Sequence, residues 1–252
     1  MLETINLSNP WSVAVGLNAL LLAIAAILPK KLLTPLGYIN AWVLGVLVWG
    51  TLGWRGYVVV MFYFLVGSAA TFVGIAEKEA EGIAEERSGA RGAGNVWGSA
   101  LTGTICAVGT LFSDYPLKEL LILGYVASFA TKLSDTIASE IGKAYGKRTF
   151  LITSLKPVPR GTEGAVSLEG TLAGIMASVV ISILAWGIGT VDSLGIVWCI
   201  IAALIATTIE SLIGATLESR FTWLTNDIVN FTNTALGAIA AILLAVGWNQ
   251  FF

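Results

Sequence analysis

The stretch KLSDTIASEIGKAYGKRTFLITSLKPVPRGTEGAVSLEGTLAG, residues 132–174, gathers charge and glycine in the middle of an apolar chain. Long hydrophobic runs flank it, and Asp135, Glu140 and Glu169 lie inside or at the edges of those runs. An acid at the centre of a bilayer-spanning helix costs roughly 2.5–3.5 kcal/mol on insertion scales, so by default it marks a functional site. The segment between the acids is basic and contains glycine. It therefore combines candidate ligands for a divalent cation with a candidate phosphate-binding loop.

The composition of the whole chain indicates a membrane protein. Hydrophobic residues make up 56% of its 252 residues and charged residues only 12%, with a mean hydropathy of +0.83. Soluble domains contain about 25% charged residues. We therefore expect an all-α fold, a polytopic transmembrane helix bundle that forms one membrane domain over residues 1–252. Apolar runs of spanning length predict about eight helices, near residues 11–29, 35–53, 56–76, 95–112, 117–142, 165–188, 194–217 and 228–248.

The loops between these runs alternate in charge. One face receives only Arg55 and Lys118, whereas the other receives Lys30, Lys31, Lys78, Arg87, Arg91, Lys143, Lys147, Arg148, Lys156, Arg160 and Arg220. The positive-inside rule places the basic face in the cytoplasm and both termini on the non-cytoplasmic side. Two cytoplasmic loops are longer than a turn: an acidic, glycine-rich loop at 77–94 and a basic loop at 143–164.

The residue types that are missing limit the chemistry. The chain has no histidine, which excludes serine–histidine triads and histidine metal sites. Cys106 and Cys199 lie in separate apolar runs and are typical of small buried hydrophobic residues. Catalysis must therefore use carboxylates, lysine or arginine, hydroxyls and amides.

Polar residues near the end of the 117–142 run predict a metal site. Lys132, Thr136 and Glu140 share one helix face by their spacing, and Asp135 lies one step round. Mg²⁺ is usually held by one or two carboxylates together with substrate phosphates. We expect Asp135 and Glu140 to be its ligands, with Glu210 of the 194–217 run as a third. The alternatives are a helix end that simply emerges into water, and a Glu140 that pairs with a nearby lysine, Lys143 or Lys147.

Residues 159–167, PRGTEGAVS, predict a phosphate-binding turn. Backbone N–H groups of a glycine-rich turn that leads into a helix attract anions, and Arg160 and Thr162 add donors. The alternative is a plain helix start with Thr162 as its N-cap. At the start of the last run, Asn226, Asn230 and Asn233 form a polar stripe, which could bind substrate or simply hydrogen-bond to a neighbouring helix.

These motifs together resemble the phytyl-phosphate kinase family. The resemblance rests on KLSDTIASEIGKAYGKR, PRGTEGAVSLEGTLAG, ESLIGA and the pattern TNxxxN, and it extends from about Ala70 to Gly237. The family consists of multispanning membrane proteins of plant plastids and cyanobacteria, with archaeal and animal relatives. The matching positions are Lys132, Asp135, Ser139, Glu140, Gly142, Arg160, Gly161, Thr162, Gly164, Ser167, Glu210, Gly214, Asn226 and Asn230, with looser matches at Lys78, Arg91 and Asn95.

The resemblance implies a kinase that converts phytyl phosphate to phytyl diphosphate, in the salvage of phytol for tocopherol and related prenyl lipids. Similarity in logic to CTP-dependent polyprenol kinases makes CTP the first choice among nucleotide triphosphates, with Mg²⁺ as cofactor. We assign catalysis to Lys132, Asp135, Glu140 and Arg160, and metal binding to Asp135, Glu140 and Glu210. We assign nucleotide binding to Gly161, Thr162, Gly164, Ser167, Lys143 and Arg91, and substrate binding to Asn95, Ser139, Asn226 and Asn230.

The expected partners are a prenyl monophosphate from the bilayer and a nucleotide, without nucleic acid, and a homo-oligomer is left open. The expected location is a cyanobacterial plasma or thylakoid membrane, or a plastid-type membrane, with the active site facing the cytoplasm. A secondary transporter of an anion or prenyl phosphate is the main alternative, because transporters also carry polar residues within their spans. A CDP-alcohol transferase is disfavoured, because Asp135 stands without the cluster of aspartates that such enzymes carry.

Overall fold

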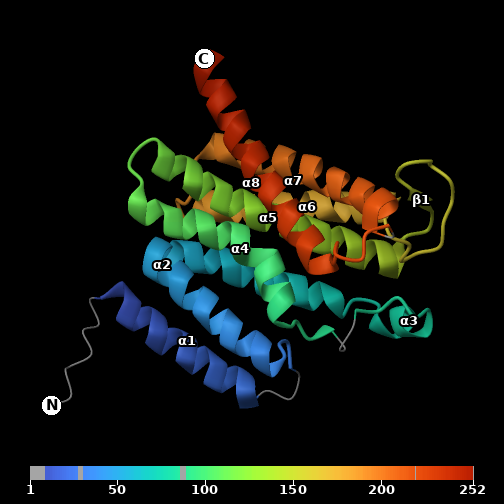
Figure 1. The fold of residues 1–252 in the computed structure, drawn as a ribbon, viewed down its shortest axis with the longest axis horizontal. Helices are drawn as coiled ribbons and strands as arrows, with labels where there is room; N and C mark the ends of the chain where they lie inside the picture. The colour runs from blue at the N-terminus through green and yellow to red at the C-terminus, as the bar shows by residue number, and fades with distance from the viewer. Residues whose placement is uncertain (1–8, 28–30, 86–88, 219, 252) are drawn as a thin grey trace.

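The computed structural model describes residues 9–27, 31–85, 89–218 and 220–251. Its helices are α1 (Pro10–Ile27), α2 (Pro35–Thr71), α3 (Ile75–Ala80), α4 (Ala93–Gly109), α5 (Leu117–Tyr145), α6 (Leu168–Gly187), α7 (Ser193–Ile213) and α8 (Asn226–Phe251). A 3₁₀ turn (Thr110–Phe112) follows α4, and a π-helical turn (Gly214–Glu218) follows α7. Two short antiparallel strands, β1 (Thr149–Leu151) and β2 (Ala165–Ser167), form the one sheet in the described part of the chain. The prediction of a helical polytopic membrane protein is confirmed (Figure 1).

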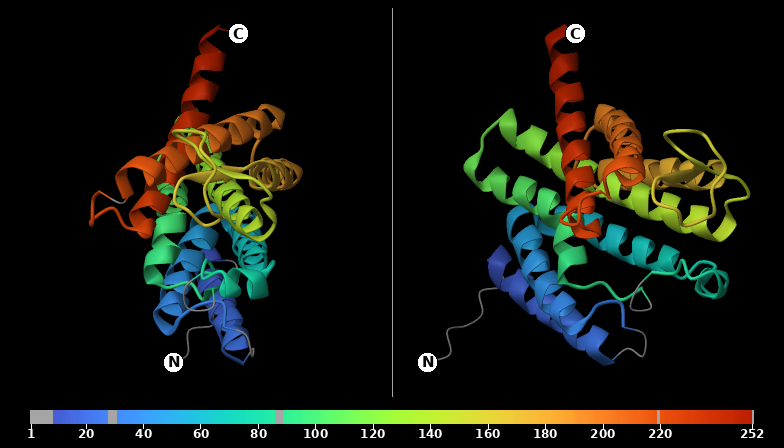
Figure 2. Two further views of the ribbon diagram at one scale, coloured as in Figure 1. Left: turned by 90° about the vertical axis from the view of Figure 1, so that its right-hand side faces the viewer. Right: turned by 45° about the vertical axis from the view of Figure 1, so that its right-hand side comes forward.

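Six of the described helices are long and apolar enough to cross a membrane: α1, α2, α5, α6, α7 with its π-helical turn, and α8. The predicted span 35–53 and most of the predicted span 56–76 belong to the single helix α2, whose 37 residues are interrupted at Gly53 (φ 65°, ψ −157°). Only glycine adopts this backbone conformation without strain. The chain changes direction sharply there (Figure 2), so the turn expected at Trp54–Arg55 is a kink one residue earlier. The 17-residue α4 corresponds to the predicted span at 95–112.

Two helix boundaries differ from the predicted spans for local reasons. The span predicted at 56–76 ends at Thr71, and Gly74, in the left-handed region at φ 60°, separates it from α3. The span predicted at 165–188 begins at Leu168, because the three residues before it pair with β1 as a strand. Ser167 caps α6, since its hydroxyl accepts a hydrogen bond from the Gly170 N–H at 3.1 Å.

Helix α5 is the centre of the bundle. It packs most extensively against α6 and also contacts α8, α7, α4 and α2 (Figure 1). Every residue from 123 to 134 is buried, as expected for a helix surrounded by others. Small residues let α6 approach closely: a methyl group added at Gly174 would lie 2.8 Å from the Ser134 carbonyl oxygen. The middle of α5 is therefore enclosed by neighbouring helices, whereas the residues that follow Ser134 are mostly only half-buried.

The two long loops lie at the same end of the bundle. Arg160 of the second loop forms an ion pair with Glu81 of the first, and Lys143 lies 3.4 Å from Glu85. Figure 1 shows α3 and β1 together at this end. Residues 86–88 of the first loop, with Arg87 among them, and Lys30 lie outside the described residues.

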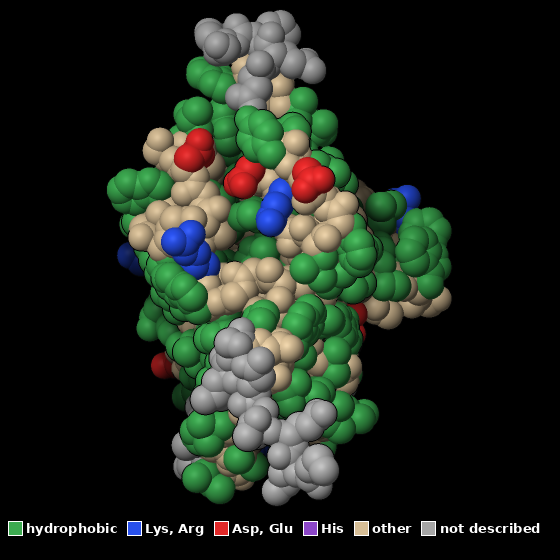
Figure 3. All heavy atoms as spheres, turned by 90° about the vertical axis from the view of Figure 1, so that its left-hand side faces the viewer, with side chains coloured by type: hydrophobic (Ala, Val, Ile, Leu, Met, Phe, Trp, Pro, Cys, Tyr) green, Lys and Arg blue, Asp and Glu red, His purple; other side chains and the backbone are tan. Residues whose placement is uncertain are grey.

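The opposite end of the bundle contains the α4–α5 and α6–α7 connections. There the Arg55 guanidinium donates a hydrogen bond to the Gly189 carbonyl at 3.2 Å. Figure 3 shows that the face carrying the α4–α5 turn is mainly hydrophobic or neutral, with few charged side chains. Among the described residues, most lysines and arginines outside the helices thus lie at the end with the long loops, as the alternation of basic residues along the sequence predicts. Which end faces the cytoplasm stays a prediction.

We expect cysteine replacements at Thr149 and Ser193 to be labelled from opposite sides of the membrane. Thr149 begins β1 at the charged end, and Ser193 begins α7 at the other. If the basic loops face the cytoplasm, an impermeant thiol reagent should label Ser193→Cys in intact cells and Thr149→Cys only in inverted vesicles. The buried Cys106 and Cys199 should contribute little background. Labelling of both positions from one side would contradict the arrangement of spans.

Candidate active site

A cavity of about 1000 Å³ opens at the end of the bundle that carries the long loops. Helices α2, α4, α5, α6, α7 and α8 and the loop at 161–167 contribute its walls. Ligand pockets in proteins typically measure about 300–1000 Å³. The predicted site residues that line this cavity are Arg91, Asn95, Lys132, Asp135, Ser139, Glu140, Lys143, Gly161, Thr162, Gly164, Ser167, Glu210, Asn226 and Asn230. Tertiary structure thus gathers, in one place, side chains from five separate parts of the sequence.

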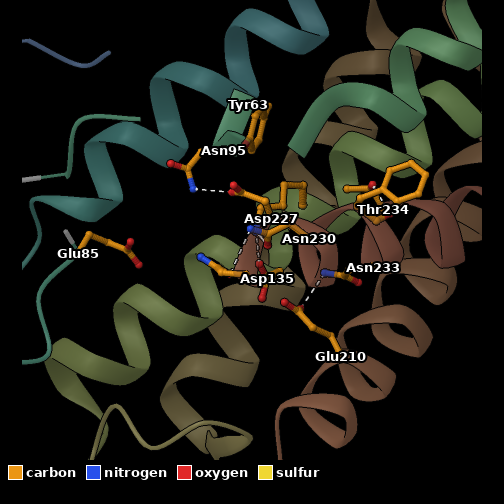
Figure 4. A network of polar contacts seen from close by, with 12 residues as sticks. Tyr63, Glu85, Asn95, Asp135, Glu210, Asp227, Asn230, Asn233 and Thr234 are labelled. Carbon is orange, nitrogen blue, oxygen red and sulfur yellow. Dashed lines mark hydrogen bonds and ion pairs between the residues drawn. The ribbon is translucent and has the colours of Figure 1, made fainter. Parts of the chain in front are cut away.

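Lys132 is held at the junction of α5 and α8. Its side chain is 8% exposed, and its ammonium lies 2.5 Å from an Asp135 carboxylate oxygen one helical turn away. The same ammonium donates to the side-chain carbonyl of Asn230 on α8, which lies beside Asp135 in Figure 4. Asn230 in turn donates to Asn226 at 3.2 Å. A lysine that is fixed by two partners presents its charge at a defined point of the cavity wall.

The carboxyl groups of Asp135 and Glu210 face one another across α5 and α7. Figure 4 shows the two side chains close together, and Glu210 also accepts a hydrogen bond from the Asn233 amide at 2.7 Å. Two carboxylates at this separation repel unless a proton or a cation lies between them. Two acids beside an open polar cavity fit the donor set that Mg²⁺ prefers, since phosphate and water oxygens can complete its coordination.

Glu140, the third predicted metal ligand, is occupied elsewhere. Its carboxylate pairs with Lys78 of α3, and both side chains are almost fully buried, at 3% and 1% exposure. Lys78 also donates to the Thr71 carbonyl at 2.8 Å. Within the described residues, no group of three or more acids or cysteines is placed to hold a metal ion. Glu140 was alternatively expected to pair with Lys143 or Lys147. Its partner is instead Lys78, which lies 62 residues away in sequence.

Arg160 joins the two long loops and is absent from the cavity lining. One guanidinium nitrogen donates to the Ala144 carbonyl at 3.0 Å, and another pairs with Glu81. Thr162 donates to the Pro159 carbonyl at 2.7 Å. Because α6 begins only at Leu168 with Ser167 as its cap, the alternative of Thr162 as an N-cap is wrong.

Gly164 lets the second loop lie directly on α7. Its φ of 71° is in the left-handed region, and an added methyl group would lie 2.6 Å from the Ser211 carbonyl oxygen. A larger residue here would push the loop away from the end of α7, where Glu210 and Gly214 line the cavity. The glycine therefore has a packing role that the motif alone did not reveal.

Comparison with known proteins places this architecture in a family. Residues 18–238 match the model of the family described as integral membrane protein DUF92. The chain belongs to this family. That region contains all the motifs from which the family was recognised in the sequence, and the recognition is confirmed. The chain is therefore an integral membrane protein by family as well as by its helices.

Relatives match almost the whole chain. An uncharacterised membrane protein of Synechocystis sp. is 62% identical over 94% of this chain and 92% of its own length. The chloroplastic protein VTE6 of Arabidopsis thaliana is 44% identical over 94% of this chain and 72% of its own length. An uncharacterised membrane protein of Methanocaldococcus jannaschii is 29% identical over 90% of this chain and 92% of its own length. No solved structure matches the chain.

Several residues of this DUF92 site were not singled out as site residues in the sequence. Asp227 lines the cavity and accepts a hydrogen bond from the Asn95 amide at 3.1 Å. Tyr63 accepts a hydrogen bond from Arg91 at 2.7 Å. Asn233, which the sequence had placed only in the polar stripe, donates to Glu210 (Figure 4). Asp227 could have been found, because it is an acid beside Asn226 at the start of an apolar run. Tyr63 lies inside a hydrophobic run and gives no such signal.

Proposed function

We propose that this protein is an integral-membrane kinase that phosphorylates a prenyl monophosphate, with phytyl phosphate as the first substrate to test. The motifs that resemble phytyl-phosphate kinases and the 44% identity to chloroplastic VTE6 support this proposal. The single observation that carries it is the cavity, which places the cations Arg91, Lys132 and Lys143 around the facing carboxylates of Asp135 and Glu210. This arrangement suits two phosphate-bearing ligands.

The chemistry requires positioning more than proton transfer. A non-bridging oxygen of the acceptor phosphate, already ionised at neutral pH, forms a bond to the γ-phosphorus of the donor. The bond from that phosphorus to the β–γ bridging oxygen breaks, and the nucleoside diphosphate leaves with the electron pair. No general base is needed, which agrees with a chain that lacks histidine. Catalysis then depends on alignment of the two phosphates and on fixed positive charge around them.

Lys132 is the residue best placed to supply that fixed charge. Its ammonium is held by Asp135 and Asn230, so little reorganisation is needed when negative charge develops nearby. Asp135 and Glu210 would hold Mg²⁺, which when bound neutralises charge on the transferring phosphoryl group. CTP is the first donor to test, because of the similarity in logic to CTP-dependent polyprenol kinases.

The position of the cavity fits a lipid substrate. It lies where the bundle meets the extramembrane loops, so a prenyl phosphate could place its charged end among the cations and keep its apolar tail among lipids. We propose that this end faces the cytoplasm, where nucleotides are available, in a cyanobacterial or plastid-type membrane. Relatives from Synechocystis and from chloroplasts support that location.

The test uses the purified full chain in lipid nanodiscs. Phytyl phosphate, Mg²⁺ and each of four γ-labelled nucleoside triphosphates are supplied, and products are separated by chromatography. We expect labelled phytyl diphosphate, formed fastest with one triphosphate, and no product when phytol replaces phytyl phosphate. Absence of product with every donor, together with uptake of phytyl phosphate or inorganic anions into proteoliposomes, would instead favour the transporter alternative.

A further inference from the structure

Arg91 is held rigidly at one edge of the cavity. Its backbone N–H donates to Leu32 and its carbonyl accepts from Thr34, both at 3.0 Å, which ties the start of α4 to the connection between α1 and α2. Its guanidinium donates to the Tyr63 hydroxyl at 2.7 Å and lies 5.2 Å from the centre of the Tyr63 ring. Both the backbone and the side chain of this arginine are therefore fixed before any ligand binds.

The charge of Arg91 has no carboxylate partner among the residues that the structure describes. The other two cations of the described cavity wall do: Lys132 pairs with Asp135 and Lys143 with Glu85. Tyr63 uses one edge of the guanidinium, which leaves further N–H donors for a ligand. A half-buried, fixed arginine without a counter-charge favours an anion with oxygens spaced to accept two hydrogen bonds, as in a phosphate.

The surroundings of Arg91 distinguish the acceptor phosphate from the donor. Leu36 of α2 also lines the cavity, and the next residue, Gly37, lies so close to the Arg91 carbonyl oxygen that an added methyl group would be 2.4 Å from it. Nevertheless 66% of the Leu36 surface is exposed, and Ile39 one turn on is 60% exposed. On a membrane-spanning helix such outward apolar residues face lipid. Lys143, in contrast, lies against Glu85 of the extramembrane loop. The cavity thus has a lipid-facing edge near Arg91 and a loop-facing edge near Lys143.

We propose that Arg91 binds the phosphate of the prenyl acceptor, whose tail leaves the cavity over Leu36 into the bilayer. The nucleotide then occupies the other edge, beside Lys143 and the loop at 161–167. This assignment rests on the proposed kinase function and moves Arg91 from the nucleotide, where the sequence placed it, to the lipid substrate.

Binding in the absence of nucleotide tests the assignment. Radiolabelled phytyl phosphate is titrated into nanodiscs that contain the wild type, Arg91→Ala, Arg91→Lys or Tyr63→Phe. Loss of two charge-assisted hydrogen bonds should weaken binding by at least about 100-fold in Arg91→Ala. Arg91→Lys should recover part of the affinity as a point charge, and Tyr63→Phe, which keeps the ring and the arginine, should lose about 3- to 10-fold, as expected for one hydrogen bond.

Matched controls separate the phosphate from the tail and from the fold. Phytol, which lacks phosphate, should bind the wild type and Arg91→Ala equally, and Arg55→Ala at the opposite end should bind phytyl phosphate like the wild type. Nucleotide affinity should stay within about twofold in Tyr63→Phe and Arg91→Lys, since neither change reaches the loop-facing edge. Equal phytyl phosphate affinity in wild type and Arg91→Ala, or a loss confined to nucleotide, overturns the assignment. If phytyl phosphate binding depends on Arg91 but no nucleoside triphosphate donates phosphate to it, the proposed kinase function is wrong. The proposal that Arg91 binds the phosphate of the lipid would still hold.

Discussion

Replacing Asp135 with asparagine should lower the rate of phosphoryl transfer by about 10³-fold, because removal of one preorganised electrostatic group at a reacting centre costs this order of magnitude. The change leaves side-chain size and helix position intact but removes one of the two carboxylates that face each other across α5 and α7. Glu210→Gln should have a similar effect for the same reason. Initial rates at saturating nucleotide and phytyl phosphate measure the loss.

A metal-binding readout distinguishes the role of Asp135 from a general disturbance of the site. Mn²⁺, which takes the same oxygen ligands as Mg²⁺, can be titrated by electron paramagnetic resonance, and its affinity should fall in both variants. The control is Asp192→Asn, which caps α7 at the far end of the bundle, where asparagine caps as well as aspartate. Full activity in Asp135→Asn, or unchanged Mn²⁺ affinity, would remove Asp135 from the metal site.

Replacing Lys78 with methionine should destabilise the protein by about 3–5 kcal/mol, because it leaves the Glu140 carboxylate buried without its partner. The ion pair is almost fully enclosed, with side-chain exposures of 1% for Lys78 and 3% for Glu140. A loss of this size corresponds to a fall of roughly 10 °C in the melting temperature of a chain this long. Melting of the detergent-solubilised protein, followed by circular dichroism, measures it.

The double variant Lys78→Met/Glu140→Leu tests whether the penalty comes from the orphaned charge. Apolar replacement of both partners should restore most of the lost stability, since a buried ion pair is often no more stable than a hydrophobic pair of similar volume. Lys143→Met is the matched control, because its pair with Glu85 is partly exposed and should contribute at most about 1 kcal/mol. If Lys78→Met melts at the same temperature as Lys143→Met, the buried pair of Lys78 with Glu140 adds nothing to stability.

Much of the fold follows from hydropathy and helical spacing. The long apolar runs have to be helices in a bilayer, because a helix satisfies its own backbone hydrogen bonds where water is absent. Helical spacing predicted that Lys132 and Asp135 lie on the same helix, with Asp135 one step round from the face of Lys132, and the structure shows that they form an ion pair. The cost of burying acids also marked Asp135 and Glu210 before their contact was visible. Such conclusions need only local geometry or the transfer free energy of one residue.

The identity of long-range partners was not accessible in the same way. Glu140 had two lysines within a few residues, yet it pairs with Lys78, because α3 packs onto the end of α5. Arg160 lies in the most basic loop, yet it forms an ion pair with Glu81 and does not line the cavity. The arginine that lines the described cavity is Arg91. Which lysine or arginine pairs with a given acid therefore depends on which helices and loops pack together.

The sequence by itself therefore determined the membrane-embedded helical class, the gathering of the two long loops at one end, and the acids of the candidate site. Tertiary structure alone decided which of those charged side chains form ion pairs with one another and which remain available to bind a ligand. The physical reason is that hydropathy and period act within a single helix, whereas a buried ion pair forms only where two helix surfaces meet. That meeting depends on close contacts such as Gly174 against Ser134 and Gly164 against Ser211, which are set by the packing of the whole bundle.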